Sequence, residues 1–127
     1  MPNREYDLKL RTAAFALAVV QMFVKLPRTT EAQVLGKQVL RSGTSVGANY
    51  REAHRARSKA EFIAKIGDCL KEMDETSYWL ELLVQAKIAT AGQLARQCAE
   101  ASELTAIFVT ILIRAKMKEE VRMKNDE

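Results

Sequence analysis

His54 is the only histidine in this chain of 127 residues, so acid–base, nucleophilic and metal chemistry must be tested around it first. A di-metal site in a helical bundle uses Glu-x-x-His pairs, whose two side chains lie one turn apart. Here Glu52 precedes His54 by two residues, so the two side chains point away from one another. The serines form no recognisable nucleophile motif with His54, and the chain has no GKS or GKT phosphate loop and no CxxC pair. We therefore expect a protein that is not an enzyme, with no catalytic residues, no metal and no cofactor.

The segment REAHRARSK, residues 51–59, is the surface that best predicts a binding partner. It carries four cations against the single acid Glu52, and these are Arg51, Arg55, Arg57 and Lys59. Repeated once per subunit around a ring, this modest charge would become a continuous anion-binding rim, which predicts contact with RNA or DNA. The net charge of +4 permits such contact without requiring it, and a solvated charged face is the alternative.

Polar residues at helical spacing precede this basic segment. Asn49 and Glu52 lie one helical turn apart, and the residues that they can face on the following helix are charged: Lys65, Glu72 and Glu75. A polar group held between helices can fix their register at some cost in stability. We expect structural hydrogen bonds from this set, with ligand binding or catalysis as the alternative. The set consists of Ser42, Ser45, Asn49 and Glu52.

Gly36, Gly43 and Gly47 lie near one face of the same stretch. A glycine inside a helix costs about 1 kcal/mol relative to alanine. Three glycines on one face therefore predict that another backbone approaches there closely. We expect this to be the tightest contact of a helical bundle.

The composition predicts that helices position all of these residues. The chain has only two prolines and five glycines, which leaves little turn chemistry for β-structure. Apolar residues at helical spacing, with the capping-box pairs Thr30/Gln33, Ser58/Glu61 and Thr90/Gln93, predict four helices. Their expected ranges are 7–25, 31–57, 59–87 and 91–122. Because short turns pack consecutive helices antiparallel, we expect one all-α domain over residues 1–127, an antiparallel up-down-up-down four-helix bundle.

The first and last helices are apolar over more of their girth than one core requires. Beside the core-facing stripe of the first helix lie Leu10, Ala14, Leu17 and Val24, and beside the stripe of the last helix lie Leu104, Ile107 and Ile111. An up-down bundle places these two helices next to each other, so we expect them to form an interface between subunits. The alternative is that both lie deep in a wide core.

Cys69 and Cys98 fall on apolar helical stripes, which predicts buried free thiols, with a disulfide as the alternative. The first nine residues are charged where the apolar core of a signal peptide would begin. The most apolar stretch, residues 13–24, is far shorter than the roughly 20 residues that cross a bilayer. We therefore expect a cytoplasmic protein that makes no contact with membranes.

Two ordered motifs carry a family resemblance. The first consists of Leu26, Pro27 and Glu31 followed by Leu40, Arg41, Ser42, Ser45, Val46, Asn49 and Glu52. The second consists of Ser58, Phe62 and the segment KEMDETSYWLELL, residues 71–83. In this order, over roughly residues 8–115, the sequence resembles the four-helix-bundle family of ribosomal RNA intervening-sequence proteins.

The resemblance implies an assembly and a class of function. A related branch is the accessory protein of diversity-generating retroelements, a basic pentameric barrel that contacts nucleic acid and a reverse transcriptase. By this resemblance we expect a homopentamer that acts as a nucleic-acid-binding scaffold, and the family has no catalytic residues to carry over. The alternative is a protein–protein adaptor whose ring presents grooves to a partner enzyme.

Overall fold

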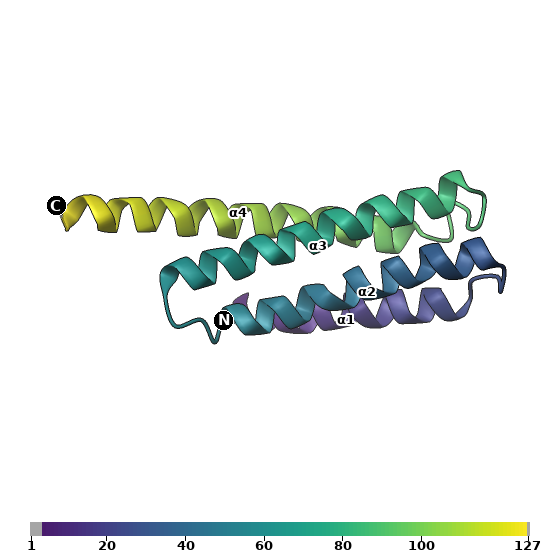
Figure 1. Cartoon of the computed structure of the whole chain (residues 1–127), viewed down its shortest axis with the longest axis horizontal. Helices are drawn as coiled ribbons and strands as arrows, with labels where there is room; N and C mark the ends of the chain where they lie inside the picture. The colour runs from purple at the N-terminus through teal and green to yellow at the C-terminus, as the bar shows by residue number, and fades with distance from the viewer. Residues whose placement is uncertain (1–3, 127) are drawn as a thin grey trace.

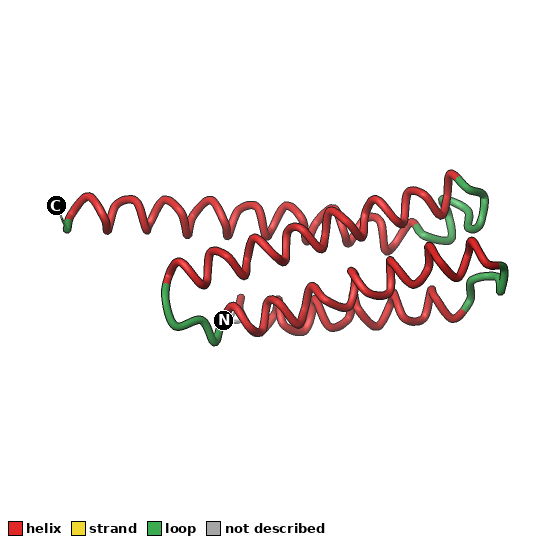
Figure 2. Tube along the Cα trace, in the orientation of Figure 1, coloured by secondary structure: helices red, strands yellow, loops and turns green. Residues whose placement is uncertain are grey.

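The computed structural model describes the backbone of residues 4–126 and the side chains of residues 7–126. The two ends of the expected domain, residues 1–3 and 127, lie outside the described residues. Four helices and no strand occur in the described part of the chain: α1 (Arg4–Val24), α2 (Thr30–Ala53), α3 (Lys59–Gln85) and α4 (Ala95–Asn125). Figure 2 shows that short loops join them.

Each helix runs back along the previous one, which produces the all-α antiparallel bundle that the sequence predicted (Figure 1). α2 packs against α1 on one side and α3 on the other, whereas α1 and α4 meet only loosely. α4 is the longest helix, and its last turns project past the ends of the other three (Figure 1). We call residues 111–125 the α4 arm. One end of the molecule therefore holds both the α2–α3 loop and the α4 arm.

A threonine cap determines where α2 begins. Thr29 Oγ1 accepts a hydrogen bond from the Ala32 amide at 3.3 Å, so Thr29 caps the helix and Thr30 is its first residue. The sequence pattern had indicated Thr30 as the cap. Gln33 donates instead to the Pro27 carbonyl at 3.0 Å, which ties the start of α2 to the preceding loop.

The capping pairs of α3 and α4 both form, with different consequences. Ser58 Oγ accepts from the Glu61 amide at 3.1 Å and caps α3. The Gln93 amide donates to Thr90 Oγ1 at 3.1 Å, and the Thr90 amide donates to Gln93 Oε1 at 2.8 Å. This second pair closes a separate turn, so α4 begins at Ala95 and not at residue 91.

α2 ends at Ala53, four residues before the expected residue 57. The Arg55 and Ala56 amides bond to carbonyls three residues back, at 3.0 and 3.2 Å, which tightens the chain into a turn. Ser58 then has the extended backbone that a helix cap requires. The start of α3 therefore limits the length of α2.

The core stripes of α1 and α3 lie where periodicity placed them. Both are buried, and they comprise Leu8, Thr12, Phe15, Val19 and Met22 on α1, and Ile66, Cys69, Met73, Thr76, Leu80 and Leu83 on α3. α4 differs from the prediction. Leu104, Ile107 and Ile111, expected beside the core stripe, pack in or against the core, whereas Cys98 is exposed, contrary to the expected buried thiol. A helix that is apolar on several sides has no unique core face in its sequence.

The three α2 glycines all face α1. A Cβ atom built on Gly43 would lie 3.0 Å from Val19 Cγ2, and one on Gly47 would lie 3.1 Å from Thr12 Oγ1. One on Gly36 would lie 2.6 Å from a side-chain carbon. Side chains at these positions would therefore hold α1 and α2 further apart.

Candidate functional site

The four predicted basic residues lie together at the end of the bundle where α2 connects to α3. Arg51 is on the last turn of α2, Arg55 and Arg57 are in the connection, and Lys59 is the first residue of α3. We call these four residues the basic turn. All four are exposed, and none forms an ion pair within the part of the chain that the structure describes. Their charges are therefore available to anions from outside the molecule.

Two acids beside the basic turn reduce its local charge. Glu52 accepts a hydrogen bond from Lys65 Nζ at 2.7 Å, and Glu61 accepts one from the Arg57 backbone amide at 3.1 Å. Together with Arg55, these residues line a shallow hollow of about 450 Å³. An open hollow with cations on its wall suits contact with phosphate groups on a surface.

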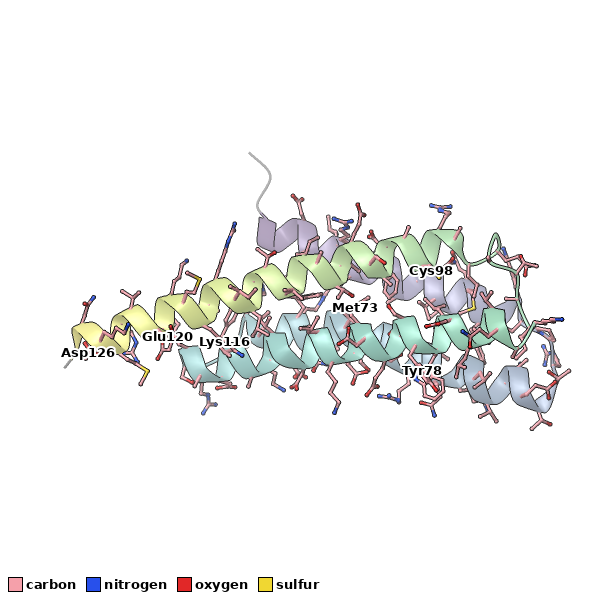
Figure 3. All side chains as sticks on the ribbon, turned by 90° about the horizontal axis from the view of Figure 1, so that it is seen from above. Met73, Tyr78, Cys98, Lys116, Glu120 and Asp126 are labelled. Atoms are coloured by element: carbon pink, nitrogen blue, oxygen red, sulfur yellow. The ribbon has the colours of Figure 1, made fainter. Side chains whose placement is uncertain are left out.

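A second group of cations, not anticipated from the sequence, lies at the same end. Residues 111–126 carry five cations against three acids, and the cations are Arg114, Lys116, Lys118, Arg122 and Lys124. Lys116, Glu120 and Asp126 follow one another along the projecting helix (Figure 3). The pKa of Glu119 is lowered first by its hydrogen bond to Arg122 and more weakly by the charge of Lys59, so the α4 arm passes close to the basic turn. The excess of cations after residue 113 is the feature of the sequence that could have indicated this second group.

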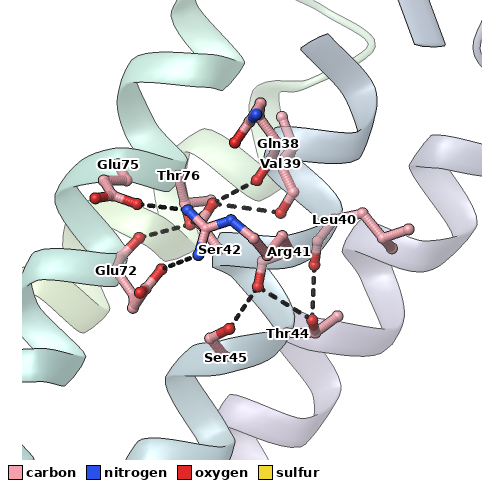
Figure 4. A network of polar contacts seen from close by, with 10 residues as sticks. All are labelled: Gln38, Val39, Leu40, Arg41, Ser42, Thr44, Ser45, Glu72, Glu75 and Thr76. Carbon is pink, nitrogen blue, oxygen red and sulfur yellow. Dashed lines mark hydrogen bonds and ion pairs between the residues drawn. The ribbon is translucent and has the colours of Figure 1, made fainter. Parts of the chain in front are cut away.

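Ser42 makes a buried polar contact between α2 and α3 (Figure 4). Its Oγ lies 2.8 Å from Thr76 Oγ1, and both side chains are fully buried. Nearer the surface, Arg41 binds Glu75 at 2.8 Å and lies 3.5 Å from Glu72. This layered contact joins α2 to α3 both in the core and at the surface.

The other three members of the predicted polar set are not brought together with Ser42. Ser45 donates to the Arg41 carbonyl of its own helix at 2.6 Å. Asn49 is half-buried, and its side chain makes no hydrogen bond to any described residue. Glu52 pairs with Lys65 at the surface. The polar set therefore does not form one site, and its buried contact depends on Thr76, which the sequence did not single out as a partner.

Cys69 and His54 are side chains of types that can do catalysis, but here both pack against other side chains. Burial raises the pKa of Cys69 to about 12, which keeps its thiol protonated. His54 packs edge-on against Tyr50, with ring centroids 4.5 Å apart, and lies 6.4 Å from the Phe62 ring. Among the described residues, no three potential metal ligands come close enough together to hold an ion.

Exposed large hydrophobic residues concentrate on α1 and α4. Of eleven such residues in the described chain, four lie on α1 and five on α4, whereas α2 and α3 contribute one each. The nine are Leu10, Leu17, Val20 and Val24 on α1, and Val109, Ile113, Met117, Val121 and Met123 on α4. Monomeric soluble proteins rarely leave such patches uncovered.

An ion pair, more than close packing, connects α1 to α4. Arg11 binds Glu100 through two hydrogen bonds of 2.7 and 2.8 Å and also binds Glu103. We call this contact the Arg11 clamp. Two open grooves of about 590 and 560 Å³ lie between the helices, one on each side of the clamp.

We expect acid to weaken the Arg11 clamp. The hydrogen bond from Arg11 holds the pKa of Glu100 below its ordinary value of 4.5, so the stabilisation is present above that value and is lost as the pH falls through the lowered pKa. Because the pair is partly exposed, Glu100→Gln should cost only about 0.5–1 kcal/mol at neutral pH, and this cost should shrink in acid. Urea unfolding at several pH values measures it. Glu81→Gln is the control, and a cost for Glu100→Gln that does not change with pH would contradict the prediction.

The sequence matches a family model described as 23S rRNA-intervening sequence protein over residues 4–110. The chain belongs to this family. The match covers α1, α2, α3 and the first part of α4. The α4 arm lies beyond the part of this intervening-sequence protein that the family model matches.

A solved structure shares the fold of this intervening-sequence protein. It is the 1.70 Å crystal structure of a protein of unknown function from the S23 ribosomal protein family of Bacteroides thetaiotaomicron VPI-5482. The TM-score is 0.77 at 39% sequence identity, over 82% of this chain and 96% of that chain. No curated protein matches the sequence. Among the described residues, no helix combines the length and apolar character that crossing a bilayer requires.

Proposed function

We propose that this intervening-sequence protein is a non-enzymatic, homo-oligomeric scaffold that contacts RNA or DNA through the basic turn. The observation that carries the proposal is the concentration of nine exposed large hydrophobic side chains on α1 and α4. A second copy of the chain can cover these surfaces. We propose the homopentamer implied by the family resemblance, in the cytoplasm, where the exposed Cys98 thiol stays reduced.

Burial of the α1 residues alone would favour assembly substantially. Leu17 is 58% exposed and Val24 is 74% exposed. Complete burial of such a side chain contributes about 1.5–3 kcal/mol, so covering the exposed half of four α1 residues contributes roughly 3–6 kcal/mol per interface. The α4 residues add to this. Association costs at least about 4 kcal/mol in lost freedom, so both helices are needed for a stable contact.

The basic turn supports nucleic-acid contact because its cations are exposed and form no ion pair with any described residue. In a ring, the four charges would repeat once per subunit and would form a cationic rim. The α4 arm adds Lys116 and Lys118 at the same end of the bundle. Contact with phosphates releases counter-ions, so the proposed binding should weaken steeply as salt is added.

The assembly is tested by placing a charge on the α1 surface. We expect Leu17→Lys to convert the wild-type oligomer to a monomer, because the interface would have to bury an unpaired ammonium group. Light scattering at micromolar concentration measures the molar mass. Val34→Lys is the matched control, since Val34 is 56% exposed on α2, and it should leave the mass unchanged. A monomeric wild-type protein would contradict the proposed assembly.

Nucleic-acid contact is tested by reversing charge in the basic turn. We expect Arg55→Glu combined with Arg57→Glu to weaken binding to a short RNA or DNA duplex about tenfold or more and to reduce its salt dependence. Lys37→Glu combined with Lys71→Glu makes the same change of charge on exposed residues of α2 and α3 outside the basic turn. Wild-type binding that does not respond to salt, or equal losses in both variants, would count against the basic turn.

A protein–protein adaptor is the second candidate, and the grooves beside the Arg11 clamp favour it. Each groove is open and lies between two helices, where a helix of a partner enzyme could pack. Co-purification of one defined protein whose binding does not depend on the basic turn would favour the adaptor. Retention on nucleic acid that is lost with salt would favour the first proposal.

A further inference from the structure

We propose that the larger of the two grooves beside the Arg11 clamp binds an adenine nucleotide, with AMP as its simplest form. This groove has a volume of about 590 Å³ and lies between the second half of α1 and the start of α4. We call it the α1–α4 groove. Its lining residues belong to one copy of the chain, and none of them belongs to the basic turn. The proposal therefore goes beyond the proposed function and does not depend on it.

A buried amide oxygen in this groove lacks a hydrogen bond. Gln97 lines the α1–α4 groove, and its Oε1 atom is buried and accepts no hydrogen bond from any residue that the structure describes. An acceptor that is buried without a partner costs free energy, so such an atom indicates a partner from outside the chain. An N–H group of a ligand in the groove would supply the missing donor. A water molecule is the alternative partner.

An adenine base matches the amide of Gln97. A glutamine amide presents an acceptor and a donor side by side, and adenine offers the complementary N6 amino group and N7 atom along one edge. Guanine offers two acceptors, O6 and N7, along the same edge, so it leaves the amide oxygen unpaired. Ala14 and Ala18 line the groove on α1, and the buried Phe15 and Met22 contribute to its lining as well. Small and apolar side chains leave room there for a flat ring.

The free charge in the α1–α4 groove is positive. Lys25 and Arg96 line it, both are exposed, and neither side chain forms an ion pair or a hydrogen bond with any described residue. The acids that line the groove are Glu100 and Glu103, and both bind Arg11. A phosphate group can therefore pair with Lys25 and Arg96 without displacing a carboxylate.

The two binding features are separated along the bundle axis. Counting from the Arg11 clamp at equal rise per residue, Gln97 comes level with about residue 15 of α1, and Lys25 lies about 15 Å further along. The long side chains of Lys25 and Arg96 extend into this interval. The ligand must therefore be elongated, with a hydrogen-bonding edge at one end and an anion at the other. A nucleotide has this form, because its ribose separates the base from the phosphate.

Calorimetric titration of the full-length protein tests the ligand. We expect AMP to bind saturably, at one molecule per chain, with a Kd below about 1 mM. GMP should bind at least about fivefold more weakly, because it cannot satisfy the Gln97 oxygen. Adenosine and inorganic phosphate should each bind at least about tenfold more weakly than AMP, because each occupies only one end of the groove.

Substitutions test the residues. We expect Gln97→Leu to weaken AMP about fivefold and to remove the preference over GMP. The urea midpoint of this variant without ligand should not fall, because leucine removes the unpaired oxygen. Lys25→Gln combined with Arg96→Gln should weaken AMP about tenfold. Lys37→Gln combined with Lys71→Gln, the matched control, removes two exposed charges outside the groove and should leave AMP binding unchanged.

The outcomes separate this inference from the proposed function. No saturable binding of AMP up to about 10 mM, equal affinities for AMP and GMP, or equal losses in both charge variants would overturn the groove and leave water as the partner of Gln97. Arg55→Glu combined with Arg57→Glu should keep AMP binding, and its loss there would place the nucleotide at the basic turn instead. A monomeric wild-type protein that binds AMP through Gln97 would support the groove while contradicting the proposed assembly.

Discussion

Gly43→Leu is expected to lower the free energy of unfolding by about 3 kcal/mol, because it forces a large side chain into a packed contact. A Cβ atom at this position would already lie 3.0 Å from Val19 Cγ2, and the rest of the leucine side chain has no room between α1 and α2. A gain of about 1 kcal/mol in helix propensity opposes this loss but is smaller. Urea unfolding at one fixed protein concentration measures the change, since assembly makes stability depend on concentration.

Gly67→Leu is the matched control for that substitution. Gly67 lies inside α3, and a Cβ atom there would meet nothing within 4 Å. The same change should therefore leave stability unchanged or raise it by about 0.5–1 kcal/mol through helix propensity. Equal losses of stability in Gly43→Leu and Gly67→Leu would contradict the prediction, because the loss at Gly43 would then not come from the close approach of α1 and α2.

Phe108→Ala is expected to cost about 4 kcal/mol, because it opens a cavity in a fully buried site. Phe108 is the last fully buried residue of α4, and its ring lies edge-on to Tyr50 with centroids 5.9 Å apart. Its loss would loosen α4 from the end of the bundle that carries the basic turn. Thermal unfolding and the urea midpoint should both fall.

Met117→Ala provides the comparison on the same helix. Met117 is 59% exposed on the α4 arm, so its truncation should change the stability of an isolated chain by less than about 0.5 kcal/mol. A Met117→Ala cost that grows with protein concentration would show that a neighbouring copy covers the arm. A Phe108→Ala cost as small as that of Met117→Ala would contradict the core position of Phe108.

The sequence predicted which residue types make up the candidate site, but not how the residues are arranged in space. The sequence identified the basic turn because four cations in nine residues are visible without a fold. It could not show that the α4 arm brings further cations to the same end, since Lys116 is more than fifty residues from Lys59 in the chain. The sequence also indicated Ser42 as part of a polar set. Which residue of α3 lies beside Ser42 depends on the relative position of the two helices along their axes, and in the structure that residue is Thr76.

Four helices, the capping pairs Ser58/Glu61 and Thr90/Gln93, and the core stripes of α1 and α3 follow from the sequence alone. These features are local, because helical periodicity and caps depend on residues three or four positions apart. The core-facing side of a helix could be derived wherever one side was clearly more apolar than the others. The Thr29 cap and the end of α2 at Ala53 differ by one and four residues from the pattern, since neighbouring turns compete for the same few residues.

The side of α4 that faces the core, and the way in which α1 and α4 meet, depend on the tertiary structure. α4 is apolar on several sides, so spacing alone could not distinguish buried Leu104 from exposed Cys98. The loose contact held by the Arg11 clamp depends on the relative positions of two helices almost ninety residues apart. The close approach of α1 to the α2 glycines takes α1 toward α2 and leaves its opposite side exposed. The spacing of Leu10, Leu17 and Val24 is visible in the sequence, but their exposure results from packing.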